Sequence, residues 1–115
     1  MSKTARGSFT GAGNAFTGRF YLSEGIKDLE GTLTAPLEAF ACHNATITYD
    51  DAADLNGPCD IPVAIPSFIG IDLFEVTLRS SATRGVAKLS GQLRPPIDSK
   101  TIIAGFGKWT PGQED

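Results

Sequence analysis

The sequence has little of what catalysis and metal binding usually require: one histidine and two cysteines in 115 residues. A lone histidine cannot work with a second imidazole, and no nucleophile motif accompanies His43. We therefore expect no catalytic residues and no enzyme activity. The two cysteines form no Cys-x-x-Cys pair, and adjacent Cys42 and His43 do not have a chelating spacing, so we expect neither zinc nor any other cofactor.

Long apolar runs are also missing. No stretch approaches the roughly 20 residues needed to cross a membrane. No apolar segment follows the basic residues of MSKTARG, as a signal peptide would require. We expect a chain made in the cytoplasm, without membrane contact, whose cysteines are reduced and buried. A disulfide between Cys42 and Cys59 is the alternative, closing a loop of about 17 residues.

Glycine and proline are abundant, with 13 and 7 copies, which disfavours long helices. Alternation of apolar and polar residues dominates instead, as in residues 29–37 and 87–93. Further candidate strands are TITY (46–49), IPVAI (61–65), residues 68–78 and TIIAGFGKW (101–109). In residues 68–78 the alternation changes phase, which predicts a β-bulge or a crossing between sheets.

These patterns predict an all-β fold. We expect an antiparallel β-sandwich or jelly-roll-like arrangement, with a small β-barrel as the alternative. The size suits a single domain over residues 1–115, with extended termini at about 1–6 and 110–115.

The glycine-rich stretch GSFTGAGNAFTGRFYL (7–22) could be mistaken for a dinucleotide-binding loop. Such a loop must open a helix, whereas the residues that follow, Arg19 to Leu22, are strand formers. GAGN instead predicts a tight turn with positive φ, joining a strand near Phe9 to one over 16–22.

An acidic loop, TYDDAADLNGPCD (48–60), offers the best cation candidates. Asp50, Asp51, Asp54 and Asn56 supply the oxygen ligands that Ca²⁺ prefers. The EF-hand register is broken, because Ala52 and Val63 occupy ligand positions. A solvated acidic turn is therefore the favoured interpretation, and an irregular calcium site is the alternative.

Aromatic side chains divide into two groups. The seven phenylalanines are expected in the core: Phe9, Phe16, Phe20, Phe40, Phe68, Phe74 and Phe106. Tyr21, Tyr49 and Trp109 have polar atoms and could line a ligand site. Candidate partner-binding residues are Lys3, Arg6, Tyr21 and Trp109.

Charge is unevenly distributed, although the net value is only −3. Residues 38–75 carry seven acidic and no basic side chains, whereas residues 79–108 carry six basic residues and one acid. The two sets either form opposite faces or neutralise each other within the fold. Nucleic acid is not expected as a partner, because the basic residues are dispersed and the total is negative.

Several segments resemble, in order, small β-proteins encoded by tailed bacteriophages. The likeness rests on GSFT, GRFYLS, LEGTL, DLFEVTLRSS and GVAKLSGQ, within residues 7–35 and 72–92. It implies a β-sandwich virion protein, such as a capsid decoration (cement) or head or tail accessory subunit. The segment 39–60 and the tail after Pro95 depart from this pattern.

The function expected from the sequence is therefore that of a non-enzymatic structural protein of a virion. It would act through contacts with itself, as a homo-oligomer, and with a capsid or other virion protein. The alternative is a small-ligand or carbohydrate-binding β-barrel that stacks ligands on Tyr21, Tyr49 or Trp109.

Overall fold

The computed structural model describes residues 2–62, 64, 66–93, 96–98 and 100–112. Its elements are β1 (Lys3–Leu22), β2 (Gly25–Tyr49), the 3₁₀ turn η1 (Ala52–Leu55), β3 (Gly57–Ile61), β4 (Ser67–Gly70), β5 (Leu73–Ser80), β6 (Val86–Gln92), β7 (Thr101–Ile103) and β8 (Gly105–Pro111). No α-helix occurs among these residues. The all-β prediction is confirmed.

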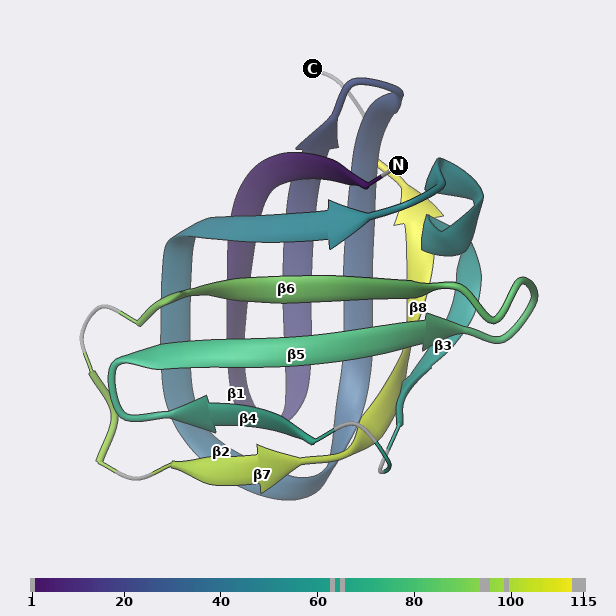
Figure 1. The fold of residues 1–115 in the computed structure, drawn as a ribbon. Helices are drawn as coiled ribbons and strands as arrows, with labels where there is room; N and C mark the ends of the chain where they lie inside the picture. Colours follow the sequence, from purple (N-terminus) through teal and green to yellow (C-terminus); the bar gives the residue numbers. More distant parts are fainter. Residues whose placement is uncertain (1, 63, 65, 94–95, 99, 113–115) are drawn as a thin grey trace.

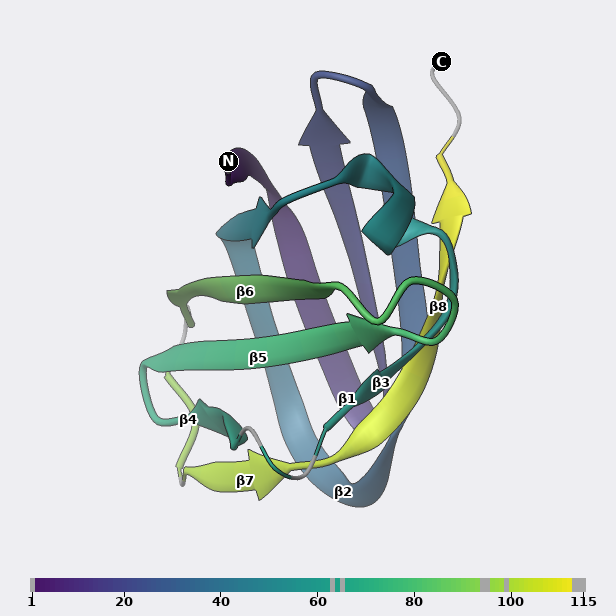
Figure 2. The same ribbon diagram turned by 45° about the vertical axis from the view of Figure 1, so that its right-hand side comes forward.

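Five antiparallel strands close into a barrel. β2 pairs with β8, β8 with β3, β3 with β5, β5 with β6, and β6 returns to β2. β2 closes this ring because it is bent: residues 27–33 pair with β8, whereas residues 46–49 pair with β6. Figures 1 and 2 show β5 and β6 running across the direction of β1 and the long part of β2. The barrel is thus built from two crossing walls.

β1 completes the wall between the two arms of β2. Its first half, residues 3–11, pairs with residues 40–49, and its second half, residues 15–22, pairs with residues 25–32. The two halves lie side by side (Figure 1), with the hydroxyls of Thr10 and Thr17 at 3.3 Å. The reversal occurs at Gly13, which has a φ of 62°. The turn predicted at GAGN is confirmed.

The described parts of the segments predicted to be extended termini, about 1–6 and 110–115, are paired mainly as strands within the fold. Lys3 to Arg6 lie opposite Tyr49 to Thr46, and Thr110 and Pro111 lie opposite Asp28 and Lys27. Residues 113–115 lie outside the described residues. The ends therefore complete the barrel's own sheet, because their backbone groups find partners on β2.

Two strand predictions need correction. The phase change in residues 68–78 is a hairpin turn at Ile71 and Asp72 between β4 and β5, not a bulge. The strand predicted at 61–65 is β3, which begins at Gly57 and ends at Ile61; positions 63 and 65 lie outside the described residues. β4 pairs with residues 73–75 of β5, beyond the part of that edge that pairs with β3, and β7 pairs with β4.

Aromatic rings fill the barrel. Phe9 contacts three others, with centroids 5.7 Å from Phe16, 5.5 Å from Phe40 and 4.9 Å from Phe74. Phe16 lies over Gly31 of β2, whose missing side chain makes room for the ring. Phe106 was wrongly assigned to the core: it is 62% exposed. Phe68 is only half-buried.

The two oppositely charged segments meet within the fold. Arg79 forms an ion pair with Asp60 at 3.0 Å, and Lys88 forms one with Glu75, also at 3.0 Å. Both pairs join the acidic segment to the basic one. They agree with neutralisation within the fold, rather than with two opposed charged faces.

The close approach of the two halves of β1 yields a stability prediction. A Cβ at Gly7 would meet the carbonyl oxygen of Arg19 and the backbone of Phe20. Because these are backbone atoms that cannot rotate aside, Gly7→Ala should destabilise the fold by about 1–3 kcal/mol. Urea unfolding followed by tryptophan fluorescence measures this. The neighbouring Ser8→Ala should change stability by less than about 0.5 kcal/mol, and equal effects would contradict the explanation.

Candidate functional site

The barrel interior is occupied by side chains, so candidate binding residues must be sought on the outer surface. Trp109 and Tyr49, both expected to line a ligand site, are buried with only 2% of their surface exposed. Trp109 packs against Phe20, with ring centroids 6.1 Å apart. Alternation along β8 explains this, since Lys108 and Phe106 point outward and Trp109 inward. Neither residue can stack on a ligand.

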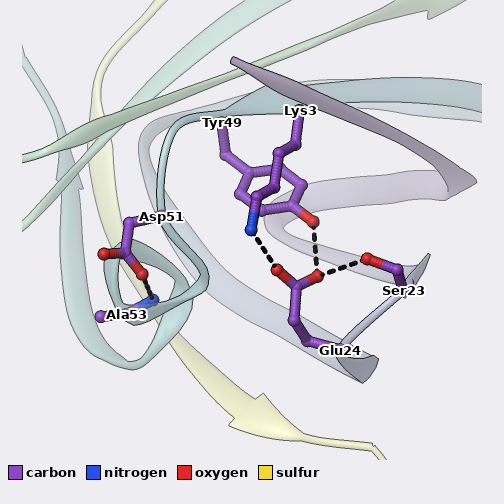
Figure 3. Close-up of polar contacts among 6 residues, drawn as sticks. All are labelled: Lys3, Ser23, Glu24, Tyr49, Asp51 and Ala53. Carbon is purple, nitrogen blue, oxygen red and sulfur yellow. Dashed lines mark hydrogen bonds and ion pairs between the residues drawn. The ribbon is translucent and has the colours of Figure 1, made fainter. Parts of the chain in front are cut away.

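Lys3 belongs to a polar cluster at the end of the barrel, drawn in Figure 3. Its ammonium pairs with Glu24 at 2.7 Å. The other carboxylate oxygen of Glu24 accepts hydrogen bonds from the hydroxyls of Tyr49 at 2.8 Å and Ser23 at 2.9 Å. These donors, Lys3 first, lower the pKa of Glu24 to about 2. The cluster fastens the N-terminus to the β1–β2 turn.

Arg6 is likewise engaged within the chain, because it donates a hydrogen bond to the amide oxygen of Asn44 at 3.2 Å. Of the four predicted partner-binding residues, Tyr21 is the one with a largely exposed ring, at 59%. The structure does not bring the four together: Trp109 is interior, and Lys3 and Arg6 hold β1 against other parts of the fold.

The acidic loop directs its oxygen atoms to separate partners. Asp51 accepts from the backbone nitrogen of Ala53 and so caps η1 (Figure 3). Asp54 is buried and accepts from the hydroxyl of Thr83. Asn56 accepts from Lys27 at 2.6 Å. Asp50 is exposed. Across the described ranges, no three His, Cys, Asp or Glu side chains gather as a metal site would need.

The two cysteines are buried free thiols, so the disulfide alternative does not describe this structure. Cys42 lies against Gly91 of β6, whereas Cys59 lies opposite Ser80 and Gly107. Burial raises the pKa of the Cys59 thiol to about 11. His43 is exposed and, being next to buried Cys42 on a strand, points away from it.

Two exposed apolar features were not expected from the sequence. One is the single side chain of Phe106 on β8. The other, which we call the β4–β7 patch, comprises Phe68, Ile71, Leu73 and Ile102, of which the last three are 54%, 41% and 65% exposed. Alternation in GFGKW could have revealed Phe106, because Trp109 and Phe106 cannot both point inward. Predicting the β4–β7 patch from the sequence would have required recognising the turn at residues 71–72.

The wall formed by β1, β2 and β8 has two adjoining hollows on its outer face, of about 360 and 380 Å³. We call this face the outer wall. Thr17 and Glu30 line both. Arg19 and Asp28 border the first, where the guanidinium holds the carboxylate with two hydrogen bonds of 2.7 and 3.0 Å. Phe106 and Lys108 border the second. These hollows and the β4–β7 patch are the candidate binding surfaces.

In the described part of the chain, no helix is long and apolar enough to span a membrane.

The lowered pKa of Glu24 makes its contribution to stability dependent on pH. Its folded-state pKa of about 2 lies below the value of about 4.3 for an unfolded glutamate. The carboxylate therefore stabilises the fold above the unfolded pKa, and this is lost as pH falls towards 2. Glu24→Gln should lower the Tm at neutral pH and have little effect near pH 2. A Glu24→Gln difference that does not change with pH would contradict this account.

Burial of both thiols predicts slow chemistry at sulfur. Native protein should react slowly with a chromogenic aromatic disulfide, because both thiols are buried and the raised pKa of Cys59 leaves that residue little thiolate. After unfolding in guanidinium without reductant, two thiols per chain should react. An absorbance titration checks both values; a titre of zero after unfolding would mean that a disulfide forms.

Comparison with known proteins gives a likeness of fold. No protein-family model matches the sequence, and no curated protein does either. A solved structure of the virulence-associated protein VapB, from the intracellular pathogen Rhodococcus equi, is similar with a TM-score of 0.51 and 13% identity. The match covers 97% of this chain and 100% of that one.

The expected relationship to tailed-phage structural proteins is therefore wrong, since the fold likeness is to a bacterial protein and not to a phage subunit. The segments that carried the resemblance explain the error. GSFT, GRFYLS and LEGTL form strands and turns of β1 and β2, and any antiparallel barrel with such turns favours similar residues. The chain is thus similar in fold, over 97% of its length, to a virulence-associated protein of R. equi.

Proposed function

We propose that this is a non-enzymatic binding protein that associates with a second copy of itself through the β4–β7 patch. The observation that carries the proposal is the gathering of exposed apolar side chains on β4, β5 and β7 and the turn between β4 and β5. The virion location expected from the sequence is not retained, because it depended on the phage resemblance. Self-association remains as the proposed mode of action.

The β4–β7 patch is contiguous across three strands, β4, β5 and β7, and the turn between β4 and β5. Phe68 lies directly opposite Ile102, and Leu73 lies opposite Gly70 at the turn that carries Ile71. Phe68, Ile71 and Leu73 line a hollow of about 340 Å³, together with Gly70, Asp72 and Lys100. Clusters of exposed apolar side chains of this kind mark interaction sites when they exceed what scattered surface residues provide.

Charges at the rim favour a second copy over an unlike partner. Of the described residues that line the hollow, one is an acid, Asp72, and one a base, Lys100, and both are exposed. The Lys100 ammonium lies 4.2 Å from the centre of the Phe68 ring. In a two-fold contact the same surface meets itself, so Asp72 of each copy can face Lys100 of the other. Among the described strands, β7 pairs only with β4, so its other edge is open for pairing with a second copy.

The absence of a catalytic function is part of the proposal. His43 and Cys42 lie on opposite faces of β2, and Cys59 is buried with a raised pKa. A base and a nucleophile are therefore not within reach of each other at these residues. The association of VapB with virulence is a property of that protein and is not carried over, because 13% identity supports a shared fold alone.

A charge introduced into the patch tests self-association. Ile102→Asp places a charge on the most exposed residue of the patch and should abolish dimers, because burying an unpaired carboxylate is costly. Val86→Asp is the matched control, since Val86 is also exposed, at 44%, but lies at the far end of β6. Sedimentation velocity over a range of concentrations measures the outcome.

Dimers in the wild type and the Val86→Asp control, with monomers for Ile102→Asp, would support the proposal. A wild-type chain that stays monomeric at the highest concentration would overturn it. Circular dichroism confirms that each variant is folded, as expected for outward-facing positions.

A further inference from the structure

The two hollows on the outer wall form one shallow groove. They adjoin at Thr17 and Glu30, and the groove follows β2 from Asp28 to Thr32. Five strand residues correspond to a length of about 13 Å between the first and last Cα atoms. This is long enough for a short linear ligand, whereas the filled interior of the barrel offers no comparable place.

One end of the groove carries an exposed aromatic ring. Phe106 lies opposite Thr32 on one side and Asp60 on the other, and 62% of its surface is exposed. Beside it, Gly31 and Gly107 lie directly opposite each other and line the floor. The space that a side chain at Gly31 would take is filled by the Phe16 ring, so Phe106 supplies the exposed apolar surface at this end of the groove.

The charged side chains of Glu30 and Lys108, at the centre of the groove, are available to a ligand. Glu30 lies opposite Lys108 in the strand register. Neither side chain makes a hydrogen bond or ion pair with any residue that the structure describes. A carboxylate and an ammonium group held on neighbouring strands can accept from and donate to the same ligand.

The charges along the groove cancel. Arg19 and Asp28 neutralise each other through their two hydrogen bonds, and Glu30 and Lys108 carry opposite charges. A strongly charged ligand of either sign would therefore gain little. The lining suits a neutral molecule that has both an apolar face and many hydroxyl groups.

We propose that this groove binds a short neutral oligosaccharide. The apolar face of one sugar ring stacks on Phe106, and its hydroxyls hydrogen-bond with Glu30 and Lys108. Thr17 and Thr32 contribute hydroxyls along the groove. The site goes beyond the proposed self-association and lies on a different wall of the barrel from the β4–β7 patch, so either can hold without the other.

The chain offers a matched control for the aromatic residue. Tyr21 is on the same outer wall and is 59% exposed, close to the value for Phe106, but it lines neither hollow. Phe106→Ala and Tyr21→Ala therefore remove similar exposed rings from inside and outside the groove. Glu30→Gln tests the carboxylate separately, because it keeps the shape of the side chain but removes its charge.

The experiment is an NMR titration of the ¹⁵N-labelled protein with three trisaccharides: cellotriose, maltotriose and chitotriose. At least one should shift the backbone amides of Thr17, Glu30, Phe106 and Lys108 in a saturable manner, with a Kd in the millimolar range or tighter. Phe106→Ala and Glu30→Gln should each weaken binding by about tenfold or more, equivalent to about 1.4 kcal/mol. Tyr21→Ala should leave the affinity unchanged.

The inference is overturned if none of the three sugars shifts these amides, or if Tyr21→Ala weakens binding as much as Phe106→Ala does. The spectrum of each variant also reports whether the barrel is intact, so loss of binding is separated from loss of folding. Repeating the titration with Ile102→Asp distinguishes this site from the other proposal, since sugar binding should survive disruption of the β4–β7 patch.

Discussion

The packing of Phe9 is the constraint on which the rest of the structure depends. Its ring touches Phe16, Phe40 and Phe74, which come from β1, β2 and β5, so one side chain holds the two crossing walls together. The interior is filled as a consequence. Rings packed this closely leave no room for a ligand inside the barrel. Residues on the surface, by contrast, can be substituted without disturbing the core. Any binding site must therefore be formed by the side chains that point outward from each strand.

Much of the fold could be predicted from the sequence, because alternation and turn residues act locally. Residues 87–93 alternate as expected, and Gly13 adopts the positive φ that GAGN indicated. The sequence predicted a barrel only as the alternative to a sandwich, because closure depends on pairing between residues 46–49 and residues 87–90 of β6, which are 38 to 44 positions apart. Alternation also cannot distinguish a bulge from a two-residue turn, since both change the phase, and this is why the break at residues 71–72 was misassigned.

The candidate sites were predicted less well, and for a consistent reason. Residue type suggested Trp109 and Tyr49 as ligand-binding aromatics, but strand register decides which face a side chain occupies, and it placed both inside. The same register turned Phe106 outward. Lys3 and Asp54 show a second limit: each is engaged by a residue far along the chain, Glu24 and Thr83 respectively. Such partners appear only once the strands are placed side by side.

The bend in β2 has a consequence for how the molecule assembles. One continuous strand supplies part of both walls (Figure 2), so neither wall can be completed while the other is unformed. The pairing partners of its two arms, β6 and β8, are the strands that follow much later in the chain. Chains dominated by such distant pairings fold slowly and lose their structure in one cooperative step. The protein should therefore be vulnerable to aggregation during synthesis, before its last strand is available to close the barrel.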